Sequence, residues 1–128
     1  MAANTADTRG HRMLAAYAIV TVLTIAANVW AAVIDFMKAD PVVANSDALG
    51  LPRSWLFWLG VLKLAGAAGL TLGLLGLRPL GVAAALGLVL FFVGAIIAHL
   101  RARVLGNIPF PGVFLALAVA TLALTAAQ

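Results

Sequence analysis

The sequence predicts an all-α fold, a polytopic membrane four-helix bundle, and three observations predict it. Hydrophobic residues make up 65% of the 128 residues and charged residues 9%, whereas soluble domains average roughly 45–50% and ~25%. Four long apolar segments follow one another along the chain, each close to the ~20 residues that a helix needs to cross a bilayer. Turn-forming residues separate these segments. A chain of this length is expected to form one domain, with the lipid bilayer as its surroundings.

The four segments are taken in chain order from their apolar length and from the residues that interrupt them. Gly76 and Pro79 mark a tight turn between the second and third segments, and "GNIPFPG" at 106–112 separates the third from the fourth. The first twelve residues, "MAANTADTRGHR", are polar and are expected to form a disordered tail. The single transmembrane domain is predicted over 13–127, with helices at about 13–36, 54–76, 79–101 and 111–127.

The longest connection joins the first two predicted helices. Asp40-Pro41 is typical of a helix start, and Gly50 is typical of a helix end. The intervening "PVVANSDAL" is therefore compatible with a short helix lying at the membrane interface. An irregular loop is an equally good interpretation, and the sequence leaves both open.

The composition excludes several classes of chemistry. The chain has no cysteine, which removes disulfides and thiol redox chemistry. Its two histidines show no metal-ligand spacing, so no metal site is expected. No glutamate is present either, which argues against a proton-coupled exporter built on a membrane-embedded glutamate. The net charge of +4 is spread thinly, without a basic patch interleaved with aromatic residues, so nucleic acid is not an expected partner.

Four polar residues fall inside the predicted spans, in the same half of the bilayer, and are the candidate pocket residues: Asn28, Asp35, Lys63 and His99. Ionisable residues inside a membrane are costly and usually face the protein and a partner. Helical side chains lean toward the N-terminus of their helix. This lean brings the ammonium of Lys63 and the carboxylate of Asp35 toward each other. We therefore predict that Asp35 holds Lys63, either directly or through Asn28 or water.

Structural interpretations of the same residues stand beside this one. The Lys63–Asp35 pair can serve only to fix the order of the helices. His99 can reach the lipid headgroups together with Arg101 and Arg103 rather than face a pocket. The predicted second helix also carries Gly66, Gly69 and Gly73 on one stripe. Small residues let membrane helices approach closely, so this stripe is expected to be a close helix contact.

Several short motifs, in order, resemble the DoxX-like family of small four-helix bacterial membrane proteins. They are LGLP at 49–52, G-x-x-K-L-x-G-A at 60–67, Arg78-Pro79, and A-x-x-A-H at 95–99, followed by the proline-containing break. The resemblance covers about residues 14–125. It implies a protein of the bacterial inner membrane with cytoplasmic termini and a pocket toward the outside. Related proteins are described as membrane oxidoreductase components, some by similarity to the small subunits of thiosulfate:quinone oxidoreductase.

Three functional hypotheses follow. The first is a membrane component of a quinone-linked redox system, or a binder of a small amphipathic molecule, with a polar pocket between the first three helices. A quinone is then the candidate cofactor, and a soluble or membrane redox protein or a second copy of the chain is the candidate partner. The second is a non-catalytic scaffold or accessory subunit with a structural Asp–Lys pair, and the third is a small-molecule transporter. No catalytic residue is indicated, and a hollow pocket would favour the first hypothesis over the second.

Overall fold

The computed structural model describes residues 2–128 and consists of helices and turns. The helices are α1 (Ala2–Phe36), α2 (Asp40–Ala48), α3 (Trp55–Leu74), α4 (Arg78–Arg101) and α5 (Pro109–Ala126), with a 3₁₀ turn η1 (Leu105–Asn107) before α5. Within residues 2–128 there is no strand, so the predicted all-α class is confirmed. The four long helices each have the length and hydropathy of a membrane span.

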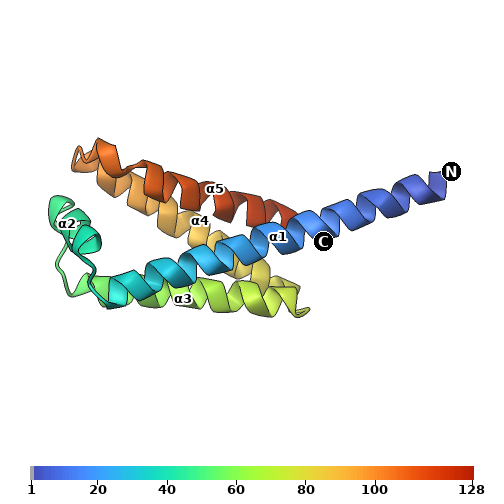
Figure 1. Cartoon of the computed structure of the whole chain (residues 1–128), viewed down its shortest axis with the longest axis horizontal. Coiled ribbons are helices and arrows are strands. Elements are labelled where there is room, and N and C mark those ends of the chain that lie inside the picture. Colours follow the sequence, from blue (N-terminus) through green and yellow to red (C-terminus); the bar gives the residue numbers. More distant parts are fainter. Residues whose placement is uncertain (1) are drawn as a thin grey trace.

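The long helices form a ring in which α1 packs against α3 and α5, and α4 packs against the same two helices. Both chain termini lie at one end of the bundle, and α2 lies at the other (Figure 1). Toward the α2 end, α4 and α5 diverge from α1 and α3 (Figure 1). We call the half of the bundle next to α2 the α2 end, and the half next to the termini the terminal end.

The segment over residues 1–12 was expected to be a disordered tail, but the structure shows a helix from Ala2 onward. Helix α1 continues to Ala2 and extends past the ends of the other helices (Figure 1), and side chains 5–15 are exposed. Adding a residue to an existing helix is far easier than starting one, and residues 2–12 contain no proline that would stop it. Met1 lies outside the described residues. The other helix bounds differ from the expected ones by no more than two residues.

The connection between α1 and α3 is a helix rather than an irregular loop. Pro41 lies in the first turn of α2, where a missing backbone N–H is tolerated. Gly50 ends it with a φ of 72°, a left-handed conformation that favours glycine. The N–H of Leu51 then donates to the carbonyl of Ser46 at 3.0 Å. Ser54 stands at the N-cap position of α3, but its side chain makes no capping hydrogen bond there.

The glycine stripe of α3 faces α4 at the terminal end. A Cβ added to Gly69 would lie 2.5 Å from the Cβ of Ala84, and one added to Gly73 would lie 2.7 Å from the Cα of Gly81. A Cβ at Gly66 would meet the side chain of Leu88 at 2.6 Å. Because real atoms do not approach this closely, the two backbones can pack at this distance only without side chains there.

The outer surface of the bundle is apolar. Large hydrophobic side chains on all four long helices are exposed, among them Ile19, Leu62, Leu90 and Val113. The buried core is small and is centred on Leu70, Ala85, Leu88, Phe92 and Ala118. An exposed apolar surface of this extent suits lipid rather than water, so the chain is a multi-pass membrane protein.

Candidate functional site

A cavity of about 680 Å³ lies at the α2 end of the bundle. Residues of all four long helices line it, and α2 and Asn107 of η1 complete its wall. Its volume falls in the range of ~300–1,000 Å³ typical of small-molecule sites. Most of the lining is apolar or aromatic, including Phe91, Phe92 and Phe114. Against this background a few polar side chains stand out, and they form two separate groups.

The first polar group is an ion pair between α3 and α1. Nζ of Lys63 donates a hydrogen bond to Oδ2 of Asp35 at 2.7 Å, and both side chains are largely buried. Nζ also lies 5.6 Å from the centroid of the Phe91 ring, within reach of a cation–π attraction. The predicted pairing of these residues is confirmed, and it is direct, without Asn28 between them. An ammonium carries three protons, so Lys63, which lines the cavity, keeps donor capacity beyond its contact with Asp35.

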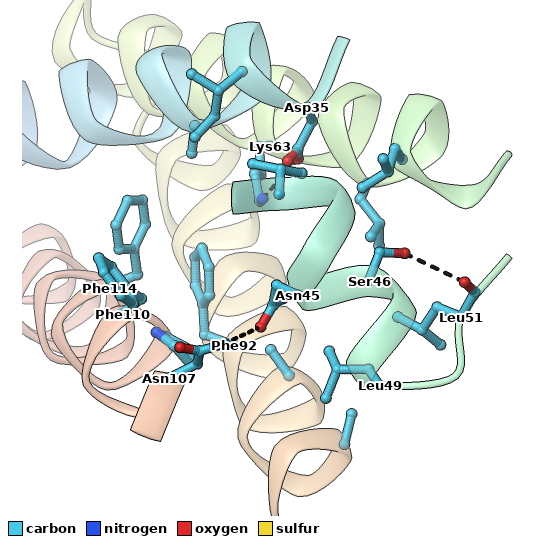
Figure 2. Close-up of a pocket in the computed structure, with 18 of the residues that line it drawn as sticks. Asp35, Asn45, Ser46, Leu49, Leu51, Lys63, Phe92, Asn107, Phe110 and Phe114 are labelled. Atoms are coloured by element: carbon cyan, nitrogen blue, oxygen red, sulfur yellow. Dashed lines mark hydrogen bonds and ion pairs between the residues drawn. The ribbon is translucent and has the colours of Figure 1, made fainter. Parts of the chain in front are cut away.

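The second polar group surrounds His99 on α4. Nδ1 of His99 lies 2.7 Å from the carbonyl oxygen of Ala95, and Nε2 lies 3.0 Å from Oδ1 of Asn45 on α2. Nδ2 of Asn107 donates to the same Asn45 oxygen at 3.1 Å. Figure 2 shows Asn45 and Asn107 close together and apart from Lys63 and Asp35. We call His99, Asn45 and Asn107 the histidine–amide cluster.

The alternative in which His99 reaches the lipid headgroups is wrong in the structure. His99 is 4% exposed and lines the cavity, whereas Arg101 and Arg103 are exposed. The hydrogen bond with the Ala95 carbonyl turns the imidazole back along its own helix, away from the membrane surface. Asn45 then contacts its far edge from α2.

Asn28 does not join the other three candidate residues. It is fully buried but is not among the residues that line the cavity. Its Nδ2 donates to the carbonyl of Thr24 at 2.9 Å, one turn toward the terminal end. The hydroxyl of Thr24 in turn lies 2.8 Å from that of Thr121 on α5. Asn28 therefore bonds within α1, next to the contact of Thr24 with α5, because its side chain leans away from the cavity toward the N-terminus of α1.

The sequence interpretation missed the amides of the cavity. Asn45 lies in the segment whose structure was left open, and Asn107 lies in a segment treated only as a break between helices. Both occur in connections on the side where Asp35, Lys63 and His99 were expected. The presence of an amide in each of these two connections was the signal that could have indicated them. The distance between the two connections, however, is set by the tertiary structure.

A second ion pair, outside the spans, holds the end of α2 to the start of α3. Arg53 contacts Asp47 through two hydrogen bonds, the shorter being 3.0 Å from Nη2 to Oδ2. These hydrogen bonds from the guanidinium, together with its charge, hold the pKa of Asp47 below its usual value. Both side chains are well exposed. Among the residues that the structure describes, no cluster of three or more His, Asp or Glu side chains is arranged to hold a metal ion.

The fold and the cavity together define a class: small polytopic helical membrane proteins with a partly polar cavity at one end of a four-helix bundle. Comparison with protein families narrows this further. The model of the DoxX-like family matches residues 19–121, and the chain belongs to that family. A search of curated proteins and a search of solved structures gave no significant match.

Proposed function

We propose that this protein binds a small amphipathic molecule in the cavity at the α2 end, and that a quinone is the first candidate. On this proposal the protein is the membrane component of a quinone-linked redox system. The observation that carries the proposal is the ion pair of Lys63 and Asp35 in the wall of an apolar cavity of about 680 Å³. A membrane protein that needs only a structural ion pair has no need of a cavity beside it.

The chemistry of the cavity supports a flat head group that accepts hydrogen bonds. Lys63 has donor capacity beyond its contact with Asp35, and Asp35 keeps that donor oriented. The rings of Phe91 and Phe92 line the same cavity and contact each other at a centroid distance of 5.0 Å. Aromatic walls suit a planar ring, and the exposed apolar helices around the site suit a ligand delivered from lipid.

Tryptophan fluorescence provides a direct test, because Trp30 and Trp55 line the cavity and Trp58 does not. In a Trp58→Phe background in lipid nanodiscs, menadione should quench the fluorescence with saturation. Lys63→Met should weaken that binding by about tenfold or more, since a hydrogen bond from a charged donor contributes about 1.5–3 kcal/mol. The double variant Asp35→Asn/Lys63→Met leaves no unpaired charge and gives the same comparison should the single variant fold poorly.

The matched control is Lys38→Met, which removes a cation from the same end of the protein but outside the cavity lining. It should leave the quenching curve unchanged. Quenching that rises without saturation, and equally in all variants, would indicate partition into lipid and would contradict the proposal. A quinone in the organic extract of gently purified protein, lost in the Lys63 variants, would identify the natural ligand.

The orientation that accompanies this proposal has the termini in the cytoplasm and the cavity toward the outside. Arginine and lysine are nearly balanced between the two sides, so the charges alone decide little. Lys38 and Lys63 are the two lysines of the chain, and Lys38 is exposed beside the cavity end. A membrane-impermeant amine reagent should label Lys38 on intact spheroplasts, with Lys38→Arg as the control. If Lys38 is labelled only after lysis, the cavity end lies in the cytoplasm and the proposed orientation is wrong.

A further inference from the structure

The cavity has two polar groups rather than one. A ligand bound through Lys63 alone would leave the second group, the histidine–amide cluster, without a role. The histidine–amide cluster lines the same cavity as the Lys63–Asp35 pair and is built from three separate elements. Its residues come from α4, α2 and η1, so the chain brings together groups that are distant in sequence. Side-chain hydrogen bonds join all three.

The separation of the two groups can be followed along α4. The ammonium of Lys63 lies over Phe91, and the imidazole of His99 is bonded to the carbonyl of Ala95. Phe91 and Ala95 are four residues apart, and Phe91 and His99 are eight apart. At 1.5 Å per residue the two groups are thus roughly 6–12 Å apart along the helix. A six-membered ring with an acceptor on each of two opposite edges, plus a hydrogen bond at each edge, spans roughly 10 Å.

The protons of the cluster follow from its hydrogen bonds. A carbonyl oxygen only accepts, so Nδ1 of His99 carries the proton that is donated to Ala95. If the imidazole is neutral, Nε2 is an acceptor, and Asn45 must present its NH₂ group to it. The oxygen and the NH₂ group of an amide have nearly the same size and shape, so rotating the amide by half a turn exchanges them without disturbing the packing. Asn45 can therefore be turned over, and Asn107 turns with it so that its oxygen accepts from Asn45.

Each arrangement of this cluster leaves one amide NH₂ group without a partner inside the cluster. With a neutral His99, the NH₂ group of Asn107 has no partner among the other residues of the cluster. With a doubly protonated His99, the oxygen of Asn45 accepts from both neighbours, as in the structure, and the NH₂ group of Asn45 is unengaged by them. Asn45 and Asn107 both line the cavity, so in both protonation states a side chain of the cavity wall has an amide donor that the cluster does not use.

We propose that the histidine–amide cluster recognises the second polar edge of the ligand, so that the ligand is a planar ring with acceptors on two opposite edges. Lys63 binds one edge, and the amide of Asn45 or Asn107 binds the other. This inference rests on the proposed function and narrows it. It selects para-dicarbonyl rings over molecules with a single polar head, such as a fatty acid or a ring with one ketone.

The test compares 1,4-naphthoquinone with 1-tetralone, a bicyclic analogue with one carbonyl, by isothermal titration calorimetry on the full chain in nanodiscs. The wild-type protein should bind the dicarbonyl about five- to tenfold more tightly. The double variant Asn45→Leu/Asn107→Leu should reduce this preference to less than about twofold while still binding both compounds. Asn107→Leu alone should do so only if the donor is the NH₂ group of Asn107, the arrangement with a neutral His99. Ser46→Ala is the matched control, because Ser46 lines the cavity on α2 but donates to the carbonyl of Leu51.

The outcomes separate the two proposals. If the wild-type protein binds both compounds equally, or if the preference survives loss of both amides, the inference about the second edge is overturned and the proposed function stands. If the wild-type protein binds neither compound, the quinone-type function itself fails and the inference fails with it. A preference that disappears in the Ser46 control as well would assign it to the position of α2 rather than to the amides, and would also overturn the inference.

Discussion

The two ends of the bundle use the same four helices in opposite ways. At the terminal end, Gly69 and Gly73 of α3 lie against Ala84 and Gly81 of α4, with no room for even one added carbon. At the α2 end the helices diverge around a cavity of about 680 Å³, and rings such as Phe92 and Phe114 line it.

The difference shows how residue size and polarity are distributed together. Small residues bring backbones close, and this leaves space for short hydroxyls that bond within the protein, as Thr24 does with Thr121. Bulky rings line the space between the helices at the other end, and Asp35, Lys63 and His99 lie there. A membrane bundle of this size can thus be closely packed at one end and hollow at the other. Each of the following predictions tests one part of this contrast.

The largest effect is expected from placing a large side chain in the close contact of α3 with α4 at the terminal end. Gly73→Leu should prevent folding, because its Cβ would meet the backbone of Gly81, which cannot move aside. The cost should exceed the ~1–3 kcal/mol of ordinary overpacking. Size-exclusion profiles and thermal unfolding in detergent measure it. Gly87→Leu is the control, since a Cβ at Gly87 meets nothing within 4 Å; equal behaviour of the two variants would contradict a close contact of α3 with α4.

A smaller but still large effect is expected from separating the ion pair at the α2 end. Lys63→Met or Asp35→Asn alone should reduce the free energy of unfolding by about 3 kcal/mol, because each leaves its partner buried without a counter-charge. The double variant should be more stable than either single one. Chemical or thermal unfolding of all four proteins in one detergent gives the comparison. Additive losses would show that the two charges are not coupled.

A modest effect is expected from the hydroxyl contact between α1 and α5. Thr24→Val and Thr121→Val should show a coupling of about 0.6 kcal/mol in a double-variant cycle, the average for hydrogen bonds between membrane helices. Thr71→Val serves as the control, because the hydroxyl of Thr71 donates to Ala67 of its own helix. A coupling of zero between Thr24 and Thr121 would leave close packing alone to hold the terminal end.

The smallest effect concerns Asp47 and Arg53 outside the bundle. The pKa of Asp47 is lower in the folded protein than its usual value of 3.8. The pair therefore contributes stability above that usual value, and this contribution disappears as the pH falls through the lowered pKa. Asp47→Asn and Arg53→Met should each remove this acid-range component and change little else, since exposed pairs contribute little. Unfolding curves between pH 2 and pH 6 test this. A loss in free energy of unfolding as large as that expected for Lys63→Met would contradict it.

The interior of the bundle was partly predictable from single residues. Lys63 and Asp35 could be paired in advance because depth along a helix and the lean of its side chains are local properties, fixed by residue count. Asn28 shares its helix face with Asp35, yet it donates to Thr24 of its own helix and does not line the cavity. Which partner a residue on that face meets depends on where the neighbouring helix crosses, and no local pattern contains that information.

The sequence by itself determined that this is an all-α membrane protein with four spans, a tight helix pair at Gly69 and Gly73, and a buried charge pair. Hydropathy, residue size and the cost of an unpaired charge act locally or between adjacent segments, so they can be followed along the chain. Only the tertiary structure decided that a cavity is present and that Asn45, His99 and Asn107 meet at it. That meeting depends on the divergence of α4 and α5 from α1 and α3 and on the position of α2, which arise from packing among all the helices at once.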